Sequence, residues 1–139
     1  MITRSAEILI ELEAILKANP ILSFVGVGKV IPIAQETNNS AAYILLNNSI
    51  PRSKGTSPEI DNYDFSGFIL ISVNVDCTNN KYLIHDVVDS IQRSILNDQT
   101  VWLKIVDRDI LSVEYDNAEF SPKRSAIVAL EVTYRLNCN

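Results

Sequence analysis

The feature that most constrains the fold is a pair of long alternating segments in the second half of the chain. In residues 126–136 every second side chain is apolar: Ala126, Val128, Leu130, Val132, Tyr134 and Leu136. A second alternation runs through Phe65, Gly67, Ile69, Ile71, Val73 and Val75, and its opposite face mixes Phe68 and Leu70 with polar residues. A period of two residues is typical of a β-strand with a buried face. The sequence therefore predicts two long strands. The strand over residues 65–75 is expected to be partly buried on both sides near its middle.

Two segments have the periodicity of helices instead. The first helix, over residues 5–18, has Ile8, Leu12, Ile15 and Leu16 at helical spacing and Ser5 as a potential N-cap. It ends at Asn19-Pro20, because the residue before proline avoids the α region. The second helix is expected to have Asn79 or Asn80 as its N-cap and to end at Asn97-Asp98. Its apolar stripe, at helical spacing, is Leu83, Ile84, Val87, Val88, Ile91 and Ile95.

The remaining segments predict shorter strands and one long loop. Residues 24–33 contain Gly26, Gly28 and Pro32, which predict an irregular or edge strand, whereas residues 41–48 are apolar on both faces and fit an internal strand. Two more strands are expected at 101–106 and 110–116, the latter with Leu111, Val113 and Tyr115 on one face. Residues 49–63 hold two prolines, a glycine and three serines and are expected to form a flexible loop.

This order of elements predicts an α+β fold: a mostly antiparallel, twisted sheet with two main helices packed on one face. The length of 139 residues fits a single domain over residues 1–139. A strand over residues 65–76 would be about 40 Å long when extended, comparable to the diameter of a domain whose radius of gyration is about 14 Å. Such strands leave long unpaired edges, so we expect subunits to associate.

Composition narrows the classes of function. The net charge of −5 and pI near 4.8 disfavour a general nucleic-acid binder, which needs a basic face. No signal peptide is recognisable at the N-terminus and no apolar window reaches the roughly 18–20 residues of a membrane span, so we expect a protein made and kept in a cytoplasm without membrane contact. In that compartment Cys77 and Cys138 are expected to be free thiols.

Candidates for chemistry are few. Asp89 could orient His85 as a catalytic base on a helix. A surface contact between residues i and i+4 is the favoured interpretation. The acidic run Asp107, Asp109, Glu114 and Asp116 lacks the glycine and spacing of a calcium loop. We therefore predict no catalytic residue, no metal site and no cofactor. A small α+β enzyme or ligand-binding domain, with a pocket near His85 or the acidic run, stays as an alternative.

The whole chain resembles the tail terminator (tail completion) proteins of long-tailed bacteriophages, which include head–tail joining or neck proteins. The resemblance lies in the opening helix SAEILIELEAILKAN, in the strand FSGFILISVNVDC leading into the helix KYLIHDVVDSIQRSIL, and in the last strand AIVALEVTYRL. It is a likeness of architecture and element order.

The resemblance implies a structural virion protein and no catalysis. Subunits of that family form a ring, usually a hexamer, on the last ring of the tail tube. The ring stops tube polymerisation and presents a surface to the head connector. It also implies a location in the tail or neck of the virion after assembly in the host cytoplasm, and passage of DNA through the ring without sequence-specific binding.

On this interpretation the loop at 49–63 orders by contact with the tube or an adjacent subunit. Arg52, Lys54, Glu59 and Tyr63 are the expected interface residues there. Trp102 is a further interface candidate, since tryptophan is enriched at interface hot spots, although packing in the core is the favoured role. A closer alternative is another ring component of a phage tail or contractile apparatus, one that polymerises or lies beside the sheath.

Overall fold

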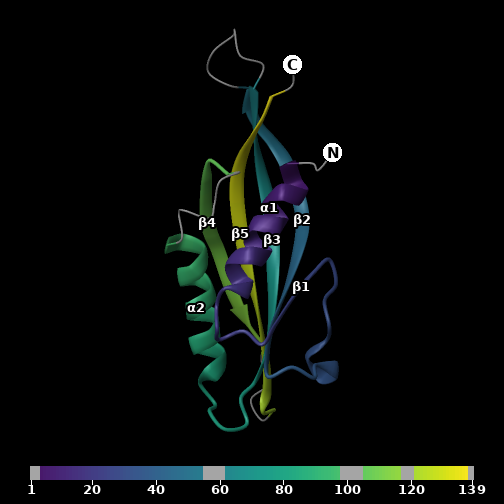
Figure 1. The fold of residues 1–139 in the computed structure, drawn as a ribbon, viewed down its shortest axis with the longest axis vertical. Coiled ribbons are helices and arrows are strands. Elements are labelled where there is room, and N and C mark those ends of the chain that lie inside the picture. Colours follow the sequence, from purple (N-terminus) through teal and green to yellow (C-terminus); the bar gives the residue numbers. More distant parts are fainter. Residues whose placement is uncertain (1–3, 55–61, 98–104, 117–120, 138–139) are drawn as a thin grey trace.

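The computed structural model describes residues 4–54, 62–97, 105–116 and 121–137, with the backbone alone at 50–54, 62–63 and 137. The described chain forms two α-helices, a short 3-10 helix and five strands (Figure 1). In chain order these are α1 (Arg4–Lys17), β1 (Phe24–Val27), η1 (Ile33–Gln35), β2 (Ser40–Lys54), β3 (Asn62–Asp76), α2 (Leu83–Asn97), β4 (Asp107–Tyr115) and β5 (Lys123–Asn137).

The strands form one sheet in the order β1-β2-β3-β5-β4. Only β1 and β2 run parallel; the other neighbours are antiparallel. The central strand β3 pairs with β5 without a register shift from Asn62↔Asn137 to Asp76↔Lys123. The predicted fold class, a mostly antiparallel sheet with two helices, is confirmed.

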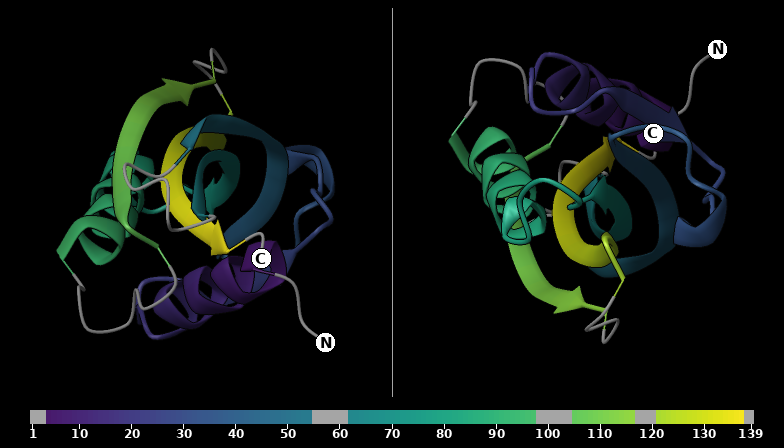
Figure 2. Two further views of the ribbon diagram at one scale, coloured as in Figure 1. Left: turned by 90° about the horizontal axis from the view of Figure 1, so that it is seen from above. Right: turned by 90° about the horizontal axis from the view of Figure 1, so that it is seen from below.

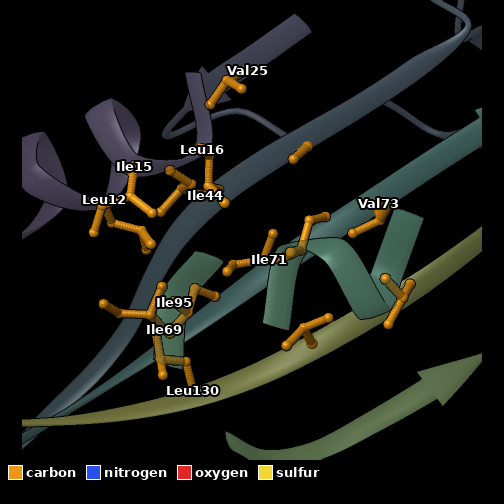
Figure 3. Close-up of a cluster of buried hydrophobic side chains, with 14 of the residues drawn as sticks. Leu12, Ile15, Leu16, Val25, Ile44, Ile69, Ile71, Val73, Ile95 and Leu130 are labelled. Carbon is orange, nitrogen blue, oxygen red and sulfur yellow. The ribbon is translucent and has the colours of Figure 1, made fainter. Parts of the chain in front are cut away.

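Both helices pack on the same face of the twisted sheet (Figures 1 and 2). Their apolar stripes meet the inward side chains of β2, β3 and β5 in one core (Figure 3). The predicted periodicities are confirmed, because the buried helical residues are Ile8, Leu12, Ile15 and Leu16 in α1 and Ile84, Val87, Val88, Ile91 and Ile95 in α2. None of the described helices is long and apolar enough to cross a membrane.

The helices are much shorter than the strands they cover. Strands β2, β3 and β5 have 15 residues each, which at about 3.4 Å per residue gives about 50 Å. Helices of 14 and 15 residues measure about 21–23 Å at 1.5 Å per residue. A narrow three-stranded ribbon of β2, β3 and β5 therefore extends past the N-terminal end of α1 (Figure 1).

The interpretation of residues 49–63 as one long loop is wrong at both ends. Residues 49–54 continue β2 and residues 62–63 begin β3, with Lys54 opposite Tyr63. Pairing with β3 outweighs the turn-forming tendency of Pro51 and the serines, and two register shifts, at Leu46/Asn48 and Pro51/Ser53, absorb the irregular residues. Residues 55–61 lie outside the described part of the chain.

Two smaller expectations also change. In β4 a register shift between Ile110 and Ser112 leaves Leu111 exposed, so Leu111 does not share a face with Val113 and Tyr115. Ile110 and Val113 pack on the core instead, because the extra residue reverses the alternation. Of the strand expected at 101–106, residues 105 and 106 precede β4 and are not strand; the rest is not described.

The side chain of Asn19, which follows α1, links the two helices. This buried amide donates from Nδ2 to Ser90 Oγ at 2.8 Å and to Ser94 Oγ at 2.9 Å, both on α2. Its Oδ1 accepts from the backbone N–H of Ile21 at 3.1 Å, which turns the chain away from the helix. One polar side chain thus ends α1 and holds its C-terminal end against α2.

We expect Asn19→Ala to lower the free energy of unfolding by about 1–3 kcal/mol, because buried partners lose their hydrogen bonds. Urea unfolding followed by circular dichroism measures the change. Glu13→Ala, at a partly exposed site on α1, is the control, with an expected change below about 0.5–1 kcal/mol. Equal effects of the two substitutions would show that the Asn19 link is unimportant.

Candidate assembly surface

Among the described residues, the sheet is open at both sides. β1 covers β2 only from Ala41 to Ile44, so the outer edge of β2 from Leu45 to Lys54 has no strand partner among the described residues. On the other side β4 reaches Thr133 of β5, and the last residues of β5 extend past it. β1 and β4 are themselves outer strands. These edges present backbone N–H and C=O groups in the way a partner strand requires.

The exposed part of β2 has features that discourage uncontrolled pairing. Pro51 has no N–H to donate, and proline in sheets is confined mainly to edge strands and bulges. The two bulges at Leu46/Asn48 and Pro51/Ser53 interrupt the regular ladder that another chain would need. β1 and β4 differ, because β1 is unbroken over four residues and β4 pairs regularly from Ser112 to Tyr115.

The sheet face opposite the helices carries an apolar row. Leu45 of β2 pairs with Leu70 of β3, which pairs with Ala129 of β5. Beside this row stands Ile127, 41% exposed, and Leu45 itself is 37% exposed. Helices α1 and α2 both lie on the other face of the sheet (Figure 2). The face is thus apolar in the middle and accessible to solvent.

One end of the same face is covered by the segment that follows β1. Glu36, only 4% exposed, accepts hydrogen bonds from Tyr43 Oη at 2.7 Å and from Asn74 Nδ2 at 2.9 Å. The Asn74 amide also donates to the backbone oxygen of Ile31 at 2.8 Å. Lys123 Nζ donates to the backbone oxygen of Glu36 at 3.1 Å. Together these bonds fix residues 31–36 across β2, β3 and β5.

The network shifts the pKa of two groups. Burial by itself raises the pKa of Glu36, but hydrogen bonds from Asn74, Tyr43 and Asn38 outweigh that effect, and the pKa is lowered from its ordinary value of 4.5. Burial, together with the adjacent carboxylate, raises the pKa of Tyr43 to about 12. Glu36 is therefore charged and Tyr43 neutral at pH 7. Sequence reasoning missed this cluster, although Tyr43 and Asn74 are polar groups within otherwise apolar strands.

The predicted interface residues are only partly located. Arg52 and Lys54 are residues of β2, and Tyr63 is a residue of β3. All three positions are in the projecting ribbon. Glu59 and Trp102 lie outside the described residues. The structure therefore brings Lys54 opposite Tyr63 and leaves the roles of all five residues as predictions.

The residues weighed for chemistry are dispersed. The imidazole of His85 packs against the ring of Tyr115 with centroids 4.7 Å apart. Along the acidic run, Asp116 pairs with Arg124 at 2.7 Å, and Asp107 accepts from the backbone N–H of Arg108. In the part of the chain that the structure describes, no three His, Cys, Asp or Glu side chains converge as metal ligands would. Cys77 is a buried free thiol, and burial raises its pKa.

Comparison with known proteins finds a likeness in fold. No family model matches the chain, and no curated protein matches it. Among solved structures, the fold is similar to that of the sheath/tube terminator of an extracellular contractile injection system, PVC, in its extended state. The TM-score is 0.51 at 10% sequence identity, and the match covers 94% of this chain. It covers 56% of that chain, so this protein spans about half of the terminator's length. The shared feature is the fold.

We expect Glu36→Gln to destabilise the protein at pH 7 by about 1.5–3 kcal/mol, the usual range for hydrogen bonds to a charged group. Because the pKa of Glu36 is lower in the folded protein than in the unfolded chain, the charged carboxylate contributes its full stabilisation above the ordinary pKa. This stabilisation is lost progressively as the pH falls through the pKa of the folded state. The difference in unfolding free energy between wild type and variant should therefore be constant from pH 7 to about 5 and shrink below 4.5.

Urea unfolding at a series of pH values measures this difference. Glu114→Gln is the matched control, because Glu114 is an exposed carboxylate on β4, and its effect should be small at every pH. A Glu36→Gln difference that did not shrink in acid would show that the carboxylate charge does not stabilise the segment.

Proposed function

We propose that this protein is a structural ring subunit that ends a tail-type tube. In the form that the sequence resemblance implies, it is a bacteriophage tail terminator. Copies form a ring, a hexamer in the usual case, on the last ring of the tube. The ring stops further polymerisation and offers its other side to the head connector. The protein would then act in the virion, without a cofactor and without catalysis.

The observation that carries this proposal is the mismatch between the sheet and its covering. Three strands of about 50 Å are covered by helices of less than half that length, and the sheet is open at β1, at β4 and along the ribbon. Open edges of this kind are templates for pairing with another chain. The similarity in fold to a sheath/tube terminator supports the choice of a tube end as the place where those neighbours meet.

The closest alternative is a ring component that polymerises, and a contractile injection system is the other setting in which a terminator would act. A solved structure with a similar fold belongs to such a system, which supports that setting as the alternative. A terminator makes one closed ring and goes no further. A tube component makes stacked rings.

The proposal predicts discrete rings in the presence of the tube protein of the same system. With that protein added, native mass spectrometry should show a single closed oligomer of this chain, and electron microscopy should show tubes that stop growing. A chain that remains monomeric at high concentration with tube protein present would contradict the proposal. Long tubes made of this chain would favour the polymerising alternative.

We further propose that the end of the projecting ribbon contacts the tube, with Arg52, Lys54, Glu59 and Tyr63 as the contributing residues. Reversing two charges, Arg52→Glu with Lys54→Glu, should weaken capping, so that tubes grow longer at a given concentration of this protein. The control, Lys81→Glu with Arg93→Glu, makes the same change in net charge at exposed positions near and on α2. Equal tube lengths with both double variants would rule out the ribbon end as the contact.

A further inference from the structure

We infer that β1 of one copy pairs with β4 of the next, so that the sheet continues from subunit to subunit around the ring. The inference rests on the proposed ring and names the surface that closes it. The two strands are the outer members of the sheet and lie on opposite sides of the molecule (Figure 1). The partner is thus a second copy of this chain, in a head-to-tail contact.

The directions of the strands allow this junction. β1 runs parallel to β2, while β2, β3, β5 and β4 alternate in direction. β4 therefore runs opposite to β1. In a flat ring every subunit has the same orientation relative to the axis, so β1 of one copy meets β4 of the next as an antiparallel pair. Antiparallel pairing is slightly more stable per residue than parallel pairing.

The two outer strands also lie at the same level of the sheet. The residue pairs across the strands form continuous rows from one edge to the other. One row is Val25, Ala42, Val73, Ala126 and Tyr115, and another is Val27, Ile44, Ile71, Val128 and Val113. In a ring whose strands run close to its axis, Val27 of one copy thus meets Val113 of the next, and Val25 meets Tyr115. Each side chain keeps the face that it occupies within its own sheet.

Charge distinguishes the two edges. The exposed carboxylates of β4 are those of Asp107, Asp109 and Glu114. The β1 edge instead has the exposed ammonium of Lys29 just after the strand. Lys17, which pairs with Glu13 at 3.0 Å, lies beside the start of β1. An acidic edge facing a lysine-bearing edge favours β1–β4 contact, and it disfavours β4–β4 contact, because like charges would then meet.

The exposed apolar side chains fit the same pairing. Phe24 and Val27 are exposed on β1, and Leu111 and Tyr115 are exposed on β4. A shallow hollow of about 280 Å³ lies next to β1 and is lined by Lys17, Leu22, Ser23, Phe24 and Val25. Tyr115 is level with Val25 and is on the helix side of the sheet, where its ring contacts His85. The Tyr115 side chain of the next copy would therefore enter this hollow.

Cysteine cross-linking tests the junction. In a Cys138→Ser background, Val27→Cys with Val113→Cys places two thiols opposite each other across the proposed pair, at a separation of about 4.5–5.5 Å between Cβ atoms, close to disulfide geometry. On oxidation of the assembled ring, we expect the monomer to convert to a ladder of covalent oligomers that ends at the copy number of the ring. The control pairs Val27→Cys with Ile10→Cys, at an exposed residue on α1, and should give no ladder.

A second measurement needs no substitution. Within one subunit the β1 and β4 edges are separated by four strand spacings, about 19 Å at about 4.8 Å each. A zero-length carbodiimide link between Lys29 and Asp109 or Glu114 can therefore form only between copies. Mass spectrometry of the linked wild-type ring should find this link.

The outcomes separate the two proposals. Rings that form, but give neither the cysteine ladder nor the lysine–carboxylate link, would overturn the β1–β4 junction and leave the ring function standing. Failure of the wild-type chain to form rings with tube protein present would overturn the proposed function itself. A ladder from the variant with Val27→Cys and Val113→Cys, together with no ladder from the Val27→Cys and Ile10→Cys control, supports both the junction and the ring.

Discussion

The whole structure depends on the uninterrupted pairing of β3 with β5. These strands match residue for residue over their full length, and β2 follows β3 on the other side for almost as far. The ladder sets the length of the molecule at about 50 Å. In the described part of the chain, two helices of 14 and 15 residues lie against it. The strands extend past the helices because of that difference in length, and the opposite face is covered at one end by residues 31–36.

The core and the edges have separate roles in this arrangement. The helices bury their apolar stripes against the middle of one face (Figure 3), and the Asn19 amide holds them together. On the opposite face the carboxylate of Glu36 anchors a short covering segment at one end. The central strands are thus fixed from both sides, while the outer strands are left accessible. A rigid centre with open edges suits a subunit whose contacts are made by its backbone.

Much of the fold could be predicted from the sequence. Periods of two and of 3.6 residues located β3, β5 and both helices, because these elements bury one face each. The full lengths of β2 and β3 cannot be predicted in this way, because Pro51 and its neighbours favour turns locally and only pairing with β3 extends β2. The face of Leu111 cannot be predicted either, because the position of a bulge depends on the partner strand. Glu36 lies in a polar turn, and the sequence does not predict its contacts because Tyr43 is on the next strand and Asn74 is 38 residues away.

We propose that the protein works through the edges of its sheet, and the rate of hydrogen–deuterium exchange at those edges is the test. Exchange would be compared between the free chain and the ring assembled on its tube. We predict that amides of β1 and β4 exchange more slowly in the ring, while those in the middle of β3, already paired on both sides, change little. Assembly that leaves exchange at β1 and β4 unchanged would contradict the account.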